Sequence, residues 1–278
     1  MEGPIGSTIN LATRYRHALR HAAMAVLLLA AGRAEAGAFN EPAGRGLVIV
    51  QGRYDTGDTY TDRQGRSVGT SPYLKREGWA YFEYGITDWL MAVVQPDVVS
   101  TRVGGSSGGR YTGFGTSAAG LQVQLPSFGP FVLALQGTYH LPGKDQPTNP
   151  ALVGNTSRDT DARGLAGAVF TLGPWPGFVD LEAGYRVRGG RSPEEVHLDM
   201  TGGLRFLPAL LVQLQSTTTI PTTGGGRYYP RPTYSNLEGS AVYDLDAHWS
   251  LQLGVFGTVF GRDALQERGV STAVWYRF

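Results

Sequence analysis

Residues 270–278 form an alternating pattern that ends in an aromatic residue. Successive side chains of a strand point to opposite sides, so Phe278, Tyr276 and Val274 share one face, while Arg277 and Ala273 lie on the other. Such a strand has one apolar and one more polar face. It can pair with the first strand of a sheet and close the sheet into a barrel. An ordinary edge strand that ends in Phe is the alternative.

The rest of the chain also consists of alternating segments that are bounded by turn-forming residues. The predicted strands cover residues 46–54, 75–85, 89–99, 115–125, 131–141, 164–172, 178–188, 195–206, 210–220, 234–243, 249–260 and 270–278. These are twelve strands. Because the number is even, the first strand starts and the last strand ends at the same end of the barrel.

The predicted connections alternate between tight turns and longer polar loops. Ile86-Thr87-Asp88 and Leu207-Pro208-Ala209 are short, whereas 55–73, 101–110 and 142–163 are long. This rhythm is typical of transmembrane barrels, which have short periplasmic turns and longer extracellular loops. A soluble two-sheet sandwich would also alternate, but it predicts neither this rhythm nor the terminal Phe. We therefore predict an all-β fold, a transmembrane antiparallel β-barrel.

In several predicted strands the alternation distinguishes a lipid-facing side from a lumen-facing side. Charges on a lipid-facing surface cost roughly 2–4 kcal/mol at the midplane, and the predicted outward sets of three strands contain none. These outward residues are Phe131, Leu133, Leu135 and Tyr139; Leu210, Val212, Leu214 and Ile220; and Trp249, Leu251, Leu253, Val255 and Val259. On residues 75–85, Trp79 and Tyr81 are expected on the inner face with Glu77 and Glu83.

The N-terminal 36 residues have the features of an export signal. Arg14, Arg16 and Arg20 precede an apolar run at 22–31, and Ala34-Glu35-Ala36 matches an A-x-A cleavage site. The run is too short to span a hydrocarbon core, which needs roughly 20 residues. We predict a cleaved signal peptide at 1–36 and a barrel at 37–278; a buried core helix is the alternative. Residues 37–45 would leave no room for a passenger domain or an energised plug.

Composition excludes several classes of protein. Apolar residues make up 41% of the chain, and no long apolar segment follows the signal, so a helical membrane protein is excluded while an alternating barrel is not. The chain has no Cys, so disulfides are excluded. The net charge is +1, and residues 1–36 hold four Arg and two acidic residues, which leaves −1 afterwards. This charge gives no basis for binding nucleic acid.

The densest set of polar residues falls on the predicted hairpin 178–206. Its inward positions include Asp180, Glu182, Arg186, Arg188, Glu195, His197, Asp199 and Arg205. On facing strands, carboxylates and guanidiniums can pair across the hairpin. The set could form a constriction that selects solutes, as charged rings do in pores, or a structural network that fills a narrow barrel.

Catalytic and metal sites are poorly supported. His140 lies at the end of a predicted strand near Ser157 and Asp159, but nothing fixes a Ser–His–acid geometry. His197 and Asp199 share one strand face, yet no third metal ligand is specified. We therefore predict no catalytic residues, no metal and no cofactor. A lipid hydrolase of the outer membrane is the enzymatic alternative.

Two groups of residues carry a resemblance to known proteins. The end of the chain resembles the C-terminal signature of bacterial outer-membrane β-barrels, in which Phe278 and Tyr276 would be the signal read by the barrel assembly machinery. Residues 41–49 and 81–90 look like a group of outer-membrane barrels that includes transporters assigned to the phenol meta-cleavage pathway. The resemblance implies a Gram-negative outer-membrane location and passage of small hydrophobic or aromatic compounds.

The sequence therefore predicts a porin-like channel in the bacterial outer membrane, in contact with outer-membrane lipid and a small-molecule solute. Passage would be passive, through a constricted polar lumen, with the loops 55–73 and 142–163 controlling access. A closed barrel that binds a partner or ligand through its loops is the alternative.

Overall fold

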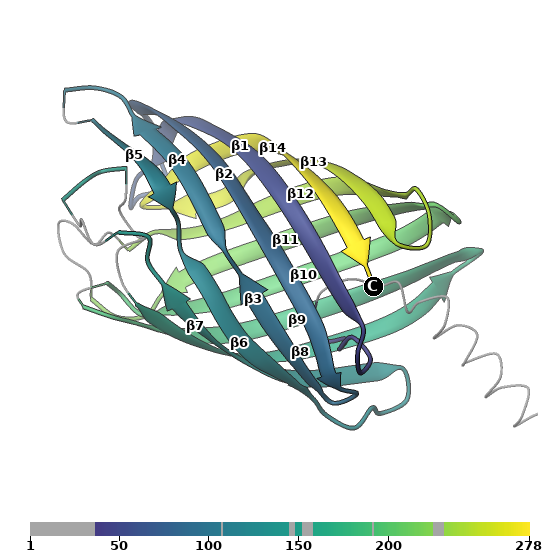
Figure 1. Ribbon diagram of the computed structural model, residues 1–278. Coiled ribbons are helices and arrows are strands. Elements are labelled where there is room, and N and C mark those ends of the chain that lie inside the picture. Colours follow the sequence, from purple (N-terminus) through teal and green to yellow (C-terminus); the bar gives the residue numbers. More distant parts are fainter. Residues whose placement is uncertain (1–36, 107, 145–147, 152–157, 191, 225–230) are drawn as a thin grey trace, which may run out of the picture.

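The computed structural model describes residues 37–106, 108–144, 148–151, 158–190, 192–224 and 231–278. It is a closed antiparallel barrel (Figure 1). The predicted signal peptide lies outside the described residues. Among the residues that are described, no helix is long and apolar enough to cross a membrane.

Fourteen strand segments make up the twelve strands of the barrel, because two of the strands are interrupted. β3 and β4 follow each other along β2, and β5 and β6 continue the next strand. The segments are β1 (Gly46–Thr61), β2 (Ser67–Thr87), β3 (Leu90–Gln95), β4 (Asp97–Val103), β5 (Gly109–Phe114), β6 (Ser117–Gln124), β7 (Phe131–Leu141), β8 (Asp159–Leu172), β9 (Trp175–Arg188), β10 (Glu195–Leu207), β11 (Leu210–Pro221), β12 (Thr233–Asp244), β13 (Trp249–Arg262) and β14 (Ala264–Arg277).

The terminal strand closes the barrel, as the sequence predicts. β1 pairs with β2 on one side and with β14 on the other. Gly46 and Phe278 exchange two backbone hydrogen bonds of 3.0 Å, so the last residue completes the seam. The ring of Phe278 lies 5.9 Å from that of Tyr276 and 6.5 Å from that of Tyr84, centroid to centroid. These aromatic rings form part of a row at the periplasmic rim.

The outward faces carry the predicted apolar belt. Phe131, Leu133 and Leu135 on β7 are exposed, while Val132 and Ala134 between them are buried in the interior. β13 shows the same alternation, with Leu251, Leu253 and Val255 exposed. Side chains that alternate in this way surround the barrel with hydrocarbon and leave the polar positions inside.

The prediction of a long first loop at 55–73 is wrong. β1 and β2 continue as a paired hairpin up to Thr61 and Ser67, so only residues 62–66 connect them. Asp55 faces Lys75 across this hairpin, and their side chains form an ion pair of 3.2 Å. This part of the hairpin alternates little in hydrophobicity, so the pattern that locates lipid-facing strands does not detect it.

The predicted loop 101–110 is likewise shorter than expected. β4 extends to Val103 and β5 begins at Gly109, with Thr101 paired to Tyr111. The interruption between β3 and β4 falls at Pro96, which has no N–H to give to a strand ladder. Gly115 N–H donates to the Asp97 carbonyl at 2.9 Å, beside the matching interruption between β5 and β6.

Residues 37–45 fold back into the periplasmic end of the lumen. Ala38 is fully buried against Val132, Ala134 and Leu165 on the inner face of β7 and β8, and Phe39 packs on the same cluster. A second apolar cluster fills the interior beside it; it consists of Leu47, Ile49, Phe178, Leu211, Val242, Ala273 and Trp275. The segment is thus a small internal plug, which the sequence did not predict.

Candidate functional site

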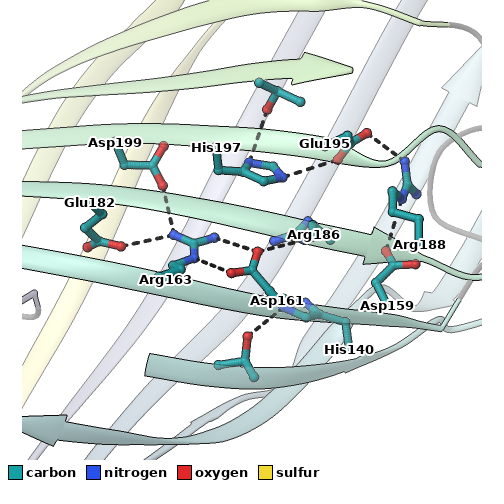
Figure 2. Close-up of polar contacts among 12 residues, drawn as sticks. His140, Asp159, Asp161, Arg163, Glu182, Arg186, Arg188, Glu195, His197 and Asp199 are labelled. Atoms are coloured by element: carbon teal, nitrogen blue, oxygen red, sulfur yellow. Dashed lines mark hydrogen bonds and ion pairs between the residues drawn. The ribbon is translucent and has the colours of Figure 1, made fainter. Parts of the chain in front are cut away.

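The charged residues inside the barrel converge on Arg163, which lies on β8 (Figure 2). Its guanidinium donates to Asp161 Oδ1 at 2.8 Å, to Asp199 Oδ2 at 2.9 Å and to Glu182 Oε2 at 3.0 Å. One guanidinium therefore bonds carboxylates from three neighbouring strands, β8, β9 and β10. Charge-assisted hydrogen bonds of this kind fix the position of every group that takes part.

Arg163 resolves a repulsion that the barrel topology creates. Glu182 on β9 and Asp199 on β10 are directly opposite each other, and like charges in such a pair destabilise a sheet. Arg163 reaches both because its own cross-strand partner is Gly184, where a Cβ would lie only 2.8 Å from Arg163 Cγ. The absence of a side chain at Gly184 gives the arginine its path.

A second set of ion pairs lies on the extracellular side of Arg163. Arg186 donates to Asp161 Oδ2 at 3.0 Å. Arg188 donates to Asp159 at 3.2 Å and to Glu195 at 2.8 Å. His197 Nε2 lies 3.2 Å from Glu195 Oε2. We call these nine residues the charged layer: Asp159, Asp161, Arg163, Glu182, Arg186, Arg188, Glu195, His197 and Asp199.

Six of the eight residues predicted for the lumen belong to this layer: Glu182, Arg186, Arg188, Glu195, His197 and Asp199. The structure does not bring the other two into it. Asp180 lies nearer the periplasm, where its carboxylate accepts the Ala38 N–H. Arg205 lies at the periplasmic rim, where it donates to Asp244 Oδ2 at 2.7 Å and to the Pro208 carbonyl at 3.1 Å.

Three members of the charged layer, Asp159, Asp161 and Arg163, were not predicted as site residues from the sequence. All three fell within the predicted loop 142–163, whereas β8 begins at Asp159. Asp159, Asp161 and Arg163 alternate with Thr160 and Ala162. This alternation continues into the apolar strand that follows, so it indicates that the three charged residues face inward from the same strand.

The lumen holds a cavity on each side of the charged layer. The inner cavity, of about 250 Å³, is lined by aromatic and amide side chains together with Arg163, Glu182 and Asp199. Its aromatic and amide residues are Trp79, Tyr81, Trp275, Gln51, Gln95, Gln136, Gln213, Gln215 and Gln252. The outer cavity, of about 410 Å³, is lined by Arg186, Arg188 and Glu195, with Tyr73 and Tyr234 among the other residues. The layer therefore separates two chambers of one lumen.

The histidines of the lumen contact neighbouring polar side chains. His140 is buried, and its Nε2 lies 2.9 Å from Thr138 Oγ1. Asp159, which faces His140 across β7 and β8, pairs instead with Arg188. Ser157 lies outside the described residues. Within the described part of the chain, no group of three or more His, Cys, Asp or Glu side chains is arranged to hold a metal ion.

Comparison with known proteins agrees with this architecture. No protein-family model and no curated protein sequence matches the chain. The fold is similar to the COG4313 outer membrane channel from Pseudomonas putida F1, with a TM-score of 0.68 and 15% identity over 88% of this chain and 100% of that one. This is the fold of a bacterial outer-membrane β-barrel. Together with the apolar belt, it places the protein in the outer membrane.

Two porins have the same fold at lower similarity. The KdgM porin gives a TM-score of 0.52 at 9% identity, over 83% of this chain and 99% of its own. The NanC porin gives a TM-score of 0.53 at 8% identity, over 82% of this chain and 98% of its own. All three of these similar proteins are channels or porins by name.

Proposed function

We propose that the protein is an outer-membrane channel for passive passage of small molecules. The observation that carries this proposal is a lumen of two polar chambers that meet at the charged layer. A solute would enter the outer cavity, pass Arg163 and reach the inner cavity before it leaves at the periplasmic end. The similarity to a channel and to porins supports the same role.

The lining of the inner cavity supports small aromatic solutes that carry hydrogen-bonding groups. Trp79, Tyr81 and Trp275 offer aromatic faces, and the glutamines offer both donors and acceptors. The cavity of about 250 Å³ is small for a ligand pocket. This solute class agrees with the aromatic compounds that the resemblance to phenol-pathway transporters implies.

The charge of the layer supports a preference for cations. It contains five carboxylates against three guanidiniums, so the formal charge of these eight groups is −2. Rings of acidic side chains favour cations in pores. A cationic or neutral aromatic solute therefore fits the lumen better than an anionic one.

Purified protein in planar bilayers and liposomes tests the proposal. We expect a small cation-selective conductance, and faster uptake of tyramine than of 2-cyclohexylethylamine, which has the same charge and no aromatic ring. Trp79→Leu is expected to reduce that difference. Absence of both current and uptake would refute the channel.

A closed barrel that binds a ligand without passing it is the second candidate. The observation in its favour is that residues 37–45 and the apolar cluster fill the periplasmic end of the lumen. Quenching of tryptophan fluorescence by tyramine, without any uptake, would support this candidate instead.

A further inference from the structure

Asp180 is a buried carboxylate without a cationic partner in the described chain. Its side chain faces the lumen from β9 and is 2% exposed. It accepts one backbone N–H, that of Ala38, at 2.7 Å, and the ion pairs of the nearby Arg163, Arg186 and Arg188 in the described chain do not include it. Glu182, on the same face of β9, is already paired with Arg163. Since an unpaired buried charge is expensive, this position favours a cation.

Gly37 lies directly against that carboxylate. A Cβ placed on Gly37 would be 2.6 Å from Asp180 Cγ and 2.7 and 2.8 Å from its two oxygens. The φ angle of Gly37 is +143°, in a region that other residues rarely adopt. Its carbonyl accepts a 2.7 Å hydrogen bond from Nε2 of the fully buried Gln122. Only glycine fits between these two side chains.

The predicted cleavage site supplies the missing cation at this point. Hydrolysis of the Ala36–Gly37 amide by water, catalysed by a leader peptidase, gives Ala36 a carboxylate and Gly37 an amino group, which takes up the released proton. The new ammonium nitrogen is bonded to the same α-carbon from which the Cβ described above would project toward Asp180. We propose that Asp180 is the binding site for the α-ammonium group of the cleaved chain.

This ion pair would anchor the internal plug formed by residues 37–45. The remaining contacts of the plug are mostly neutral: Asn40 N–H donates to Gln124 at 2.9 Å, and Gly44 N–H donates to the Gly85 carbonyl at 2.8 Å. Before cleavage, Gly37 has an uncharged amide nitrogen, and Asp180 lacks its counter-ion. Cleavage of the leader therefore fixes the plug in the periplasmic end of the lumen.

The reactivity of the α-amine tests the proposal on protein purified from outer membranes after expression of the full chain. Mass spectrometry should identify Gly37 as the first residue. An N-hydroxysuccinimide ester at mildly acidic pH should acylate this amine at least tenfold more slowly in the folded barrel than in guanidinium. Asp180→Asn should remove most of that protection, whereas Asp246→Asn in an exposed periplasmic turn should not. A different first residue, or equal rates in wild type and Asp180→Asn, would overturn the proposal.

A second variant keeps the test decisive if Asp180→Asn does not fold. Insertion of Ser-Gly-Ser-Gly between Ala36 and Gly37 moves the ammonium away from Asp180 and leaves every lumen side chain in place. We expect the barrel to lose its folded electrophoretic migration at a lower temperature. The same insertion between Gln64 and Gly65, in the connection between β1 and β2, is the matched control. Equal transition temperatures for the two insertions would contradict the ion pair.

Discussion

Arg163 is the residue on which the charged layer depends. Its guanidinium neutralises the repulsion between Glu182 and Asp199, which face each other across β9 and β10. These three side chains are mostly buried and in contact, so their contributions to stability are coupled. Removal of one of them leaves a buried charge without its partner.

We predict that Arg163→Met lowers the free energy of unfolding by about 3 kcal/mol, the size expected when a buried ion pair loses one partner. Urea titration in phospholipid vesicles measures it. The triple variant Arg163→Met, Glu182→Gln, Asp199→Asn should recover most of the loss, because no net charge remains buried among these groups. If the triple variant is as unstable as the single one, packing by the arginine side chain explains the effect instead.

Glu41, in the internal plug, gives a pH dependence of defined sign. Burial raises the pKa of its carboxyl above the usual range, against the opposing effect of Arg277 and Arg45. As pH rises from about 4, Glu41 loses its proton in the unfolded chain at a lower pH than in the folded barrel. The free energy of unfolding therefore decreases with pH between the unfolded and the folded pKa of Glu41.

The prediction is that Glu41→Gln flattens this part of the stability profile and makes the barrel more stable at neutral pH. Denaturant unfolding at several pH values measures both changes. Asp246→Asn is the control for removal of a negative charge at the periplasmic side. The N–H groups of His248 and Trp249 lower the pKa of Asp246, so its shift is opposite in sign to that of Glu41. A decrease in neutral-pH stability for Glu41→Gln would contradict the assignment.

At the scale of elements, the regularity of the apolar–polar alternation determined how much of each strand could be predicted from the sequence. Strands β7, β11 and β13 were located almost to the residue, because lipid on one side and lumen on the other impose strict alternation. The outer parts of β1 and β2 and the start of β8 were missed, since polar side chains there weaken the apolar–polar contrast. Arg163 was not predicted as a lumen residue, because it lies in that missed part of β8. The seating of residues 37–45 depends on long-range contacts that no local pattern encodes.

The last strand gives a prediction about assembly. Deletion of Phe278 removes two backbone hydrogen bonds to Gly46 and the ring contacts with Tyr276 and Tyr84. We expect a several-fold lower yield of heat-modifiable barrel in outer membranes. Phe278→Tyr keeps the backbone bonds and an aromatic ring, and it should assemble normally. Equal yields for the deletion and for wild type would show that neither the seam nor a terminal aromatic signal limits assembly.

At the scale of the whole molecule, two barriers lie in series along the lumen. The charged layer separates the two cavities, and the internal plug with its neighbouring apolar cluster narrows the periplasmic end. Resistances in series add, so the larger one limits the current. Apolar side chains offer an ion no hydrogen bonds, and burial of a charge among them is costly. The periplasmic barrier should therefore be the larger.

This order predicts how conductance responds to removal of each barrier in the proposed channel. Deletion of residues 37–43 leaves the Gly44 N–H bond to Gly85 intact and should raise single-channel conductance several-fold in planar bilayers. The triple variant of Arg163, Glu182 and Asp199 should change conductance little by itself, because the plug still limits the current. The triple variant should have a larger effect in the deletion background, where it should also weaken cation selectivity. A large increase from the triple variant alone would place the main barrier at the charged layer.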